Sequence, residues 1–393
     1  MGAASAMGSA VAVAGLIAGC QLGSSVTPTA SVSPADPPVS SSGLAWSTVM
    51  TTTLPVSAVS ETSGWLVLET FPRTRKVVRM VEPASGRTWG FVTDPGWLSE
   101  NPVVVGDRVF LVEYNDAMVE AGKRGDVRIR AGRLDESPKV VATYTADIPT
   151  LLVVDDVLYA ATFTDSTSGG RTCLDPVESK GDPLFCVDGA MQRLTRVGDT
   201  FTFGTTVPGH RRCADLFVVD LDPLGAPRRL PTTGCVHSGE ATGDVVAWTS
   251  WTTEDESEGV NIEKMPVSVR VGSGPPVDLG LGSMGSVRAC GDAIYWNTAA
   301  EPMAEKAAAL HRWTPERGAE VVFSPKGVED LLGSVTCQVD GGLEVQSLAD
   351  TKDGLVTTVS STTTRFTEAA KVWPTIKIWT ADGKLADAAS LGE

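Results

Sequence analysis

Histidine and basic residues are scarce in this chain of 393 residues. It contains 3 histidines, and 48 Asp and Glu outnumber 32 Lys and Arg, which gives a formal net charge of -16. Because binding to a phosphate backbone requires clusters of Lys and Arg, this composition argues against a nucleic-acid partner. It also argues against docking on an anionic lipid surface by charge alone. The acidic excess is compatible with cationic ligands, although solubility alone accounts for it.

Recognisable catalytic motifs are also lacking. None of His210, His237 and His311 stands in a Gly-x-Ser-x-Gly or His-Glu-x-x-His context. The stretch Gly86–Trp89 matches half of the Ser-x-Asp-x-Gly-x-Thr-Trp box of sialidase-type propellers, but Glu82 and Ala84 replace its Ser and Asp. We attribute this half match to chance. The sequence therefore leads us to name no catalytic residue, no metal ligand and no cofactor.

The first 19 residues contain no charged side chain, and their apolar run, Ala10–Ala18, is too short to span a bilayer. The run ends in Ile17-Ala18-Gly19-Cys20, which resembles a bacterial lipobox. This resemblance implies a signal peptide over residues 1–19 and a lipid such as palmitate on Cys20, so the protein would be anchored to the cell membrane outside the cytoplasm. Signal peptides normally begin with Lys or Arg, which is missing here. A plain secretory peptide with an incidental cysteine is the alternative.

Residues 20–44 are rich in Ser, Thr and Pro and nearly free of charge. Pro28, Pro34, Pro37 and Pro38 favour an extended chain, and the segment has too little apolar surface to fold by itself. We predict a disordered tether that holds a folded domain, residues 45–393, away from the membrane.

Six cysteines remain after Cys20, an even number that predicts disulfides outside the cytoplasm. Cys290 and Cys337 occupy matching places in two repeats, so we predict that they join adjacent units. Cys173 with Cys186 would close a Gly/Pro/Asp-rich loop, and Cys213 with Cys235 follows by elimination. A zinc site formed by His210, Cys213, Cys235 and His237 is the alternative for the last pair, although the spacing is not that of a zinc finger.

A short hairpin recurs along the chain, and its clearest copy is Val287–Trp296, with a tight turn at Gly291-Asp292. Glycine adopts positive φ without steric cost, and Asp can hydrogen-bond its own backbone, so this pair favours such a turn. The repeat occurs roughly every 45 residues, which is the period of a propeller blade. The other turns are Ser63-Gly64, Gly106-Asp107, Asp155-Asp156, Gly198-Asp199, Gly243-Asp244 and Gly341-Gly342.

A second hairpin follows most of these turns, with copies at 77–87, 216–225, 310–318 and 376–383. Two hairpins per period make four antiparallel strands, which is one blade. The units resemble the blades of bacterial WD40-like and quinoprotein-like β-propellers over about residues 45–393, without a Trp-Asp pair at the blade ends. The resemblance implies an all-β ring of sheets and no particular activity.

The seven turns predict seven blades. The irregular stretch Asp165–Arg212 leaves six as the alternative, with Gln192–Thr206 as a hairpin inserted in the third blade. We expect Trp46–Thr53 to pair with the C-terminal blade and close the ring, which would protect its edges.

The short turns should lie at one end of the ring and the longer connections at the other, where binding usually occurs. We predict long connections at 114–125, 165–189, 251–266 and 297–309. An acidic run within them, Glu254–Glu258, lacks the pattern of a calcium loop and is better explained as a solvated surface. Four aromatic residues end the strands that feed these connections and are our candidate ligand-binding residues, with packing between blades as the alternative: Tyr114, Phe163, Trp251 and Trp296.

These features favour a non-enzymatic binding or protein-interaction scaffold that is tethered outside the cytoplasmic membrane and presents its loops to a protein or glycan of the cell envelope. The alternative is an extracytoplasmic hydrolase or lyase acting on carbohydrate or peptide, because a site made of scattered loop residues leaves no local motif. A quinoprotein dehydrogenase is a weaker alternative, since no feature indicates that cofactor.

Replacing the predicted lipidation site tests the anchor. In a Cys20→Ala variant the thiol that would carry the acyl chains is gone, so we expect the protein to leave the membrane fraction. Fractionation of cells followed by immunoblotting measures this, with Ser25→Ala as the control. A Cys20→Ala protein that remains in the membrane fraction like the parent would contradict the prediction.

Overall fold

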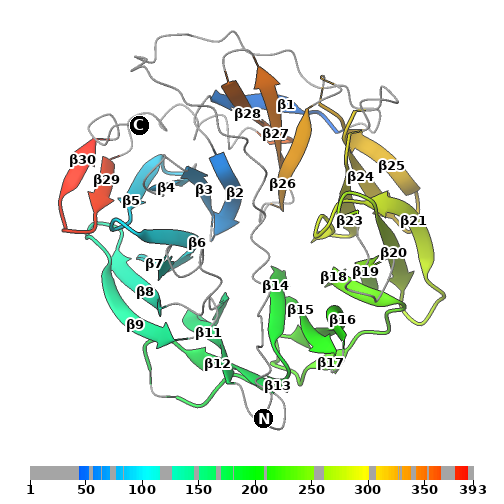
Figure 1. Cartoon of the computed structure of the whole chain (residues 1–393), viewed down its shortest axis with the longest axis horizontal. Coiled ribbons are helices and arrows are strands. Elements are labelled where there is room, and N and C mark those ends of the chain that lie inside the picture. The colour runs from blue at the N-terminus through cyan, green and yellow to red at the C-terminus, as the bar shows by residue number, and fades with distance from the viewer. Residues whose placement is uncertain are drawn as a thin grey trace, which may run out of the picture.

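The computed structural model describes residues 44–387, apart from 53–55, 63, 71–76, 83, 116–125, 146–149, 165–169, 180, 208–209, 252–260, 301–306, 326, 328–329, 338–341, 352–353 and 364–376. Within this part of the chain every regular element is a strand, and the strands form seven sheets. The sheets stand around a common axis as the blades of a propeller (Figure 1). The prediction of seven blades is confirmed. In the part described, no helix is long and apolar enough to cross a membrane.

The first three blades follow the chain in order, and the first strands of blades one and two, β2 and β6, lie toward the ring axis (Figure 1). Blade one contains β2 (Val56–Thr62), β3 (Trp65–Thr70), β4 (Val77–Glu82) and β5 (Arg87–Val92). Blade two contains β6 (Trp97–Val105), β7 (Arg108–Asn115), β8 (Asp126–Arg133) and β9 (Lys139–Thr145). Blade three contains β10 (Leu151–Val154), β11 (Val157–Thr164), β12 (Arg171–Pro176) and β13 (Cys186–Asp188).

The remaining blades continue around the ring, and the seventh takes its outer strand from the beginning of the domain. Blade four contains β14 (Met191–Val197), β15 (Thr200–Val207), β16 (His210–Asp220) and β17 (Arg228–Arg229). Blade five contains β18 (Cys235–Thr242), β19 (Val245–Trp251), β20 (Met265–Val271) and β21 (Val277–Gly282). Blade six contains β22 (Arg288–Cys290), β23 (Ala293–Thr298), β24 (Ala309–Thr314) and β25 (Gly318–Phe323). Blade seven contains β26 (Leu331–Cys337), β27 (Leu343–Thr351), β28 (Gly354–Ser361) and β1 (Ser47–Thr52).

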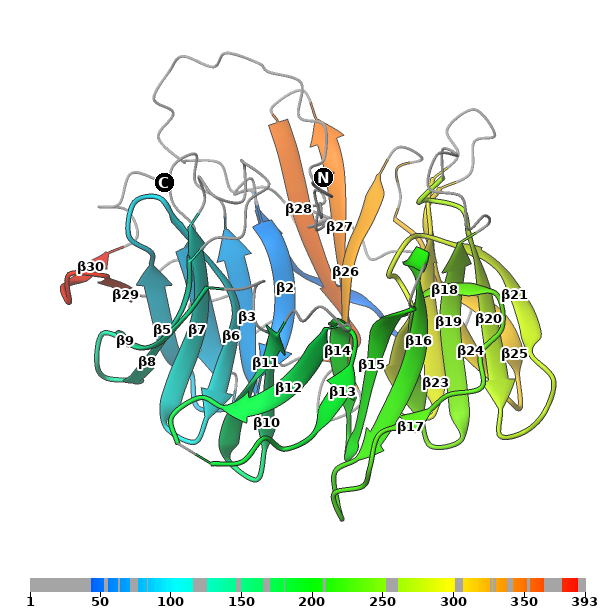
Figure 2. The same cartoon turned by 60° about the horizontal axis from the view of Figure 1, so that its bottom comes forward.

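The repeated turns join the first and second strands of the blades, as predicted. Gly106, Gly243 and Gly291 have φ of 60°, 56° and 61° there, a region in which residues with a Cβ are rare. In blade three the same turn is made by Asp155 and Asp156, which also adopt positive φ. We call this end of the ring the turn end, and it forms the lower rim in Figure 2. The opposite end, where second strands lead to third strands, is the loop end.

Strand β1 closes the ring. It pairs antiparallel with β28, with Ser47 opposite Ser361 and Thr52 opposite Thr357, and it completes the seventh sheet. Trp46 fixes the start of this strand: its indole Nε1 donates to the carbonyl oxygen of Val322 at 2.8 Å, and its ring lies edge-on to Phe323. The predicted closing strand is therefore confirmed, and it links blade seven to the core of blade six.

The C-terminal hairpin departs from the prediction. We expected 376–383 to be the outer half of a blade, but β29 (Lys377–Thr380) pairs in parallel with β5 of blade one, with Trp379 opposite Phe91. The partner β30 (Leu385–Asp387) lies outside it, so blade one has six strands. An alternating strand can pair with any exposed edge, and the hydrophobic pattern does not specify which.

The boundary between blades three and four explains the irregular stretch. Strands β12 and β13 lie within the segment 165–189 that we predicted to be one long connection, so that prediction is wrong. Strands β14 and β15 form the inner half of blade four instead of an inserted hairpin. Strand β13 contains only 3 residues, which is why the sequence pattern there is weak.

Three disulfides form with the predicted pairing. Cys173–Cys186 joins paired strands of blade three, where the two residues face each other. Cys213–Cys235 joins β16 of blade four to β18 of blade five. Cys290–Cys337 joins the inner strands of blades six and seven. Two of the three bonds thus connect adjacent blades.

Removing the Trp46 side chain should weaken closure of the ring. Trp46 is buried, so a Trp46→Ala variant loses both its packing on Phe323 and its bond to Val322. We expect unfolding to become easier by about 3–5 kcal/mol. Urea denaturation followed by tryptophan fluorescence and circular dichroism measures it, with the exposed Val277→Ala as control. A loss no larger than that of the control would show that this contact does not hold the closing strand.

Candidate functional site

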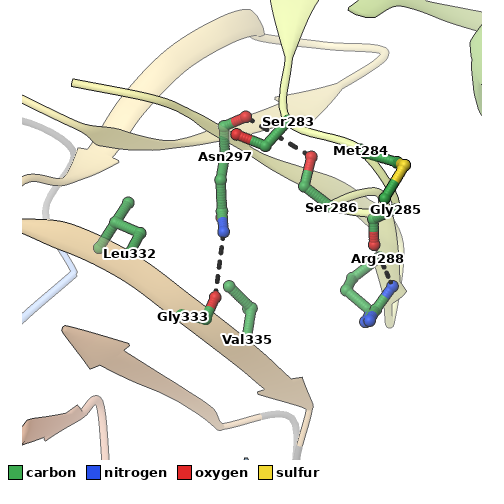
Figure 3. A pocket seen from close by; sticks show the side chains of 9 residues that line it. All are labelled: Ser283, Met284, Gly285, Ser286, Arg288, Asn297, Leu332, Gly333 and Val335. Carbon is green, nitrogen blue, oxygen red and sulfur yellow. Dashed lines mark hydrogen bonds between the residues drawn. The ribbon is translucent and has the colours of Figure 1, made fainter. Parts of the chain in front are cut away.

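A small cavity lies at the loop end of the ring, beside the inner strands of blades six and seven (Figure 3). Its volume is about 190 Å³. One wall is the connection from β21 to β22, and the other wall is the beginning of β26. The lining residues are Ser283, Met284, Gly285, Ser286, Arg288, Asn297, Leu332, Gly333 and Val335.

Hydrogen bonds with the end of β23 fix the first wall. The backbone N–H of Ser283 donates to the carbonyl oxygen of Asn297 at 2.8 Å, and the Ser286 hydroxyl approaches the same oxygen at 3.5 Å. Gly285 has φ of 67°, which lets the chain turn back toward β22. The two serine hydroxyls are therefore held beside the cavity by backbone contacts.

Asn297 connects the two walls. Its Nδ2 donates to the carbonyl oxygen of Gly333 at 3.2 Å (Figure 3). The side chain is only 7% exposed, and its Oδ1 has no hydrogen-bond partner among the described residues. A buried acceptor without a partner is uncommon in folded proteins, which makes this oxygen a candidate contact for a ligand.

Arg288 begins β22 and supplies a positive charge to the cavity. Its Nη1 donates to the carbonyl oxygens of Val287 and Gly285, at 2.8 and 3.0 Å, and lies 3.3 Å from Glu240 Oε1. Glu240 is buried in β18, and its Oε2 accepts from the Ala289 N–H at 2.7 Å. Burial raises the pKa of Glu240, while the nearby Arg288 lowers it. This contact ties blade five to blade six.

A second arginine reaches the same place from blade four. The Arg193 guanidinium lies so close to Gly285 that a Cβ at Gly285 would stand 2.8 Å from Arg193 Nη1. Its Nη2 bonds the Nε2 of His237, and no described carboxylate lies within salt-bridge distance of it. Although much of the side chain meets solvent, protein atoms around the guanidinium desolvate it and lower its pKa to about 10, with a further lowering by Arg288. Arg193 still carries its charge at neutral pH.

His237 supports Arg193 from the inner strand of blade five. It is 6% exposed, and its Nδ1 lies 3.1 Å from the Ser238 hydroxyl. Burial, and next the positive Arg193, lower its pKa to about 3. His237 is therefore neutral at physiological pH, with Nε2 free of a proton to accept from Arg193 and Nδ1 protonated.

Two of the four predicted aromatic residues lie around this site. Trp251 is half-buried and meets His237 edge-on, with 4.7 Å between the ring centroids. Trp296 precedes Asn297, is 1% exposed and stacks on His311. Neither tryptophan lines the cavity. Each instead packs next to a residue of the site or precedes one in the chain.

The other two predicted residues lie in different blades. Tyr114 is 7% exposed and packs beside Val112 and Val127 in blade two. Phe163 is half-buried in blade three, with its ring against Gly170. The structure thus does not gather the four aromatics into one described cavity. The acidic run 254–258 lies outside the described residues.

The residues that line the cavity were missed in the sequence, although Arg288 lies within the clearest repeat. Arg193 and Arg288 each lie near the beginning of an inner strand, the strand of the blade that is nearest the ring axis. This position in the repeat is the sequence feature that could have identified them. The aromatic residues at the ends of the second strands indicate residues next to the cavity instead.

Three other features lie outside this cavity. Arg128 and Arg130 of β8 each bond both Glu113, which is buried, and Asp94, so these charges satisfy one another. A larger cavity of about 460 Å³ lies at the turn end between blades two and three, where Arg108 pairs with Glu178. Cys213 and Cys235 are disulfide-bonded, so their sulfurs do not form the alternative zinc site with His237.

No protein-family model and no curated relative matches the chain. Among solved structures, it is similar to the β-propeller domain of the Trilobed protease from Pyrococcus furiosus, with 11% identity and a TM-score of 0.51 over 79% of this chain and 94% of that chain. That propeller has an open velcro topology, whereas β1 closes the ring here.

It is also similar to an acylaminoacyl peptidase from Pyrococcus horikoshii and to an acylaminoacyl peptidase in complex with Z-Gly-Gly-Phe-chloromethyl ketone. Each is 11% identical, with a TM-score of 0.50 over 79% of this chain. Each match covers 52% of the peptidase, so this chain spans about half its length. At these identities the likeness supports the β-propeller fold and no activity.

The low pKa of His237 predicts a pH-dependent stability. Between about pH 6.5 and about pH 3 the unfolded chain binds a proton at His237 that the folded protein excludes, so stability falls as the pH falls through this window, by up to about 1.4 kcal/mol per pH unit. Urea unfolding at pH 7, 6 and 5 measures the slope. We expect His237→Gln to reduce it and His311→Gln to keep it. Equal slopes in the parent and in His237→Gln would overturn this assignment.

Proposed function

We propose that this protein is an extracytoplasmic lipoprotein, anchored through Cys20, whose propeller is a binding scaffold that presents its loop end to a component of the cell envelope. The observation that carries the binding role is the cavity at that end. Its lining offers serine hydroxyls, an arginine and an unpaired amide oxygen, and no acid or histidine is among the described residues that form it. Such a lining suits recognition, because general acid–base catalysis needs a titratable group within reach.

Two features favour a location outside the cytoplasm. The lipobox-like Ile17-Ala18-Gly19-Cys20 and the charge-poor residues 20–44 suit an anchor and a tether. The three disulfides suit an oxidising compartment, since such bonds are rare where thiols are kept reduced.

An extracytoplasmic hydrolase is the second candidate, favoured by the similarity to propellers of peptidases. In an enzyme, several ionisable groups with shifted pKa values should converge on the cavity. Here the described residues with shifted pKa values near it are Arg193 and His237, which bond each other, and Glu240, which is held by Arg288 and by the Ala289 N–H. This arrangement favours binding over catalysis.

Site-specific crosslinking in intact cells tests the scaffold. A photoreactive benzoylphenylalanine replaces Met284 at the cavity in one variant and Asp244 at the turn end in the other. We expect a discrete crosslinked species from position 284 and little from position 244, because the loop end is the binding face. Equal crosslinking from both positions, or crosslinking only from 244, would count against the proposal.

A further inference from the structure

We infer that the cavity binds a carboxylate that carries a hydrogen-bond donor close by, with Arg193 and Arg288 holding the carboxylate and Asn297 Oδ1 accepting from the donor. The inference rests on the proposed binding function and specifies the chemistry of its ligand. Both guanidiniums border Gly285, one through its close approach and the other through a hydrogen bond of 3.0 Å to the carbonyl oxygen.

The two arginines retain unused donors. All described hydrogen bonds of Arg288 come from Nη1, so its Nε and Nη2 have no described partner, and its side chain is 38% exposed. The described bond of Arg193 is the one to His237, a neutral group. Glu240, the one described carboxylate on Arg288, also bonds a backbone N–H. The site therefore has positive charge in excess, within a chain whose formal net charge is -16.

A carboxylate suits this set of donors. Guanidinium groups bind planar carboxylates through two parallel N–H bonds, a geometry that a single ammonium cannot reproduce. The hydroxyls of Ser283 and Ser286 add donors on the same wall. A volume of about 190 Å³ is enough for one terminal unit of a ligand, and Met284, Leu332 and Val335 offer its aliphatic part an apolar surface.

Asn297 adds a second requirement, a hydrogen-bond donor on the ligand. Its Oδ1 is buried without a described partner, while its Nδ2 is fixed on Gly333. An acceptor in this position would repel a second oxyanion and would be satisfied by an N–H or O–H of the ligand. Two ligand types combine a carboxylate with a nearby donor: the C-terminal residue of a peptide, with its amide N–H, and a sugar acid, with its hydroxyls.

Arg193 is held ready for this role. Its backbone has φ of 52° at the irregularity of β14 between Gln192 and Thr195, a conformation that is uncommon for a residue with a Cβ. Neutral His237 accepts from one nitrogen of the guanidinium and so orients the remaining donors without cancelling the charge. His237 is thus a positioning residue in this site.

Calorimetric titration of the full chain in detergent tests the inference with three probes. N-acetylglycine represents a peptide terminus, glucuronate represents a sugar acid, and N-acetylglycinamide is the neutral control. We expect saturable binding of one of the two acids and none of the amide. Binding of N-acetylglycine alone identifies a peptide terminus as the ligand, and binding of glucuronate alone identifies a sugar acid. Absence of binding by both acids, or equal binding of the amide, overturns the inference.

Two variants assign the binding to this cavity. Arg193→Gln should weaken it by roughly tenfold or more, because a charge-assisted contact is lost. The control Arg317→Gln changes the net charge equally but lies in the exposed β24–β25 turn at the opposite end of blade six. Arg288→Lys keeps a charge beside Glu240, so folding is preserved, but it removes the planar fork and should also weaken binding. Equal affinity of Arg193→Gln and Arg317→Gln would exclude this site.

The titration and the crosslinking together separate this inference from the scaffold itself. If crosslinking from position 284 persists in the parent while neither acid binds, the scaffold stands and the carboxylate ligand is wrong. If both acids bind but no crosslink forms from position 284, the cavity is a small-molecule site and the envelope partner is wrong.

Discussion

Pairing of β1 with β28 holds the ring of blades closed. A ring of blades built in chain order ends with an incomplete last sheet, and its exposed edge would invite pairing with other chains. Here β1 fills that position, and Trp46 anchors it by a bond to Val322 and by packing on Phe323. The first and last parts of the ring are therefore held together by backbone hydrogen bonds. The inner strands keep their places around the axis because the ring is closed.

The candidate site depends on this arrangement, because no single blade contains it. Arg193 comes from blade four, His237 and Glu240 from blade five, Arg288 and Asn297 from blade six, and Gly333 from blade seven. Glu240 lies toward the turn end of β18, and the other residues lie toward the loop end of an inner strand or of the strand beside it. Repetition of one simple unit thus brings residues separated by more than a hundred positions to one place. The geometry of the site therefore depends on the relative placement of four blades.

Local patterns predicted the repeating part of the fold and the structure followed them. Turns such as Gly291-Asp292 need positive φ, which depends on two neighbouring residues, and Cys290 and Cys337 were paired because they share a place in the repeat. The position of the C-terminal hairpin does not follow from local pattern, because the choice among sheet edges depends on distant residues. The site was missed for the same reason. Arg193 is positioned by contacts with His237 and Gly285, which lie far from it in the sequence.

The disulfides connect the site to the compartment in which the protein is proposed to work. Cys235 lies two residues before His237, and its bond to Cys213 fixes that inner strand to blade four, which carries Arg193. Cys290 lies two residues after Arg288, and its bond to Cys337 fixes β22 to the strand that carries Gly333 and Val335. The first bond thus fixes the strand of His237 to blade four, and the second joins two strands that carry lining residues of the cavity. Since each blade contacts its neighbours mainly through side-chain packing, these covalent links limit the sliding of one inner strand past the next. Oxidation therefore stabilises the fold by holding blade four to blade five and blade six to blade seven.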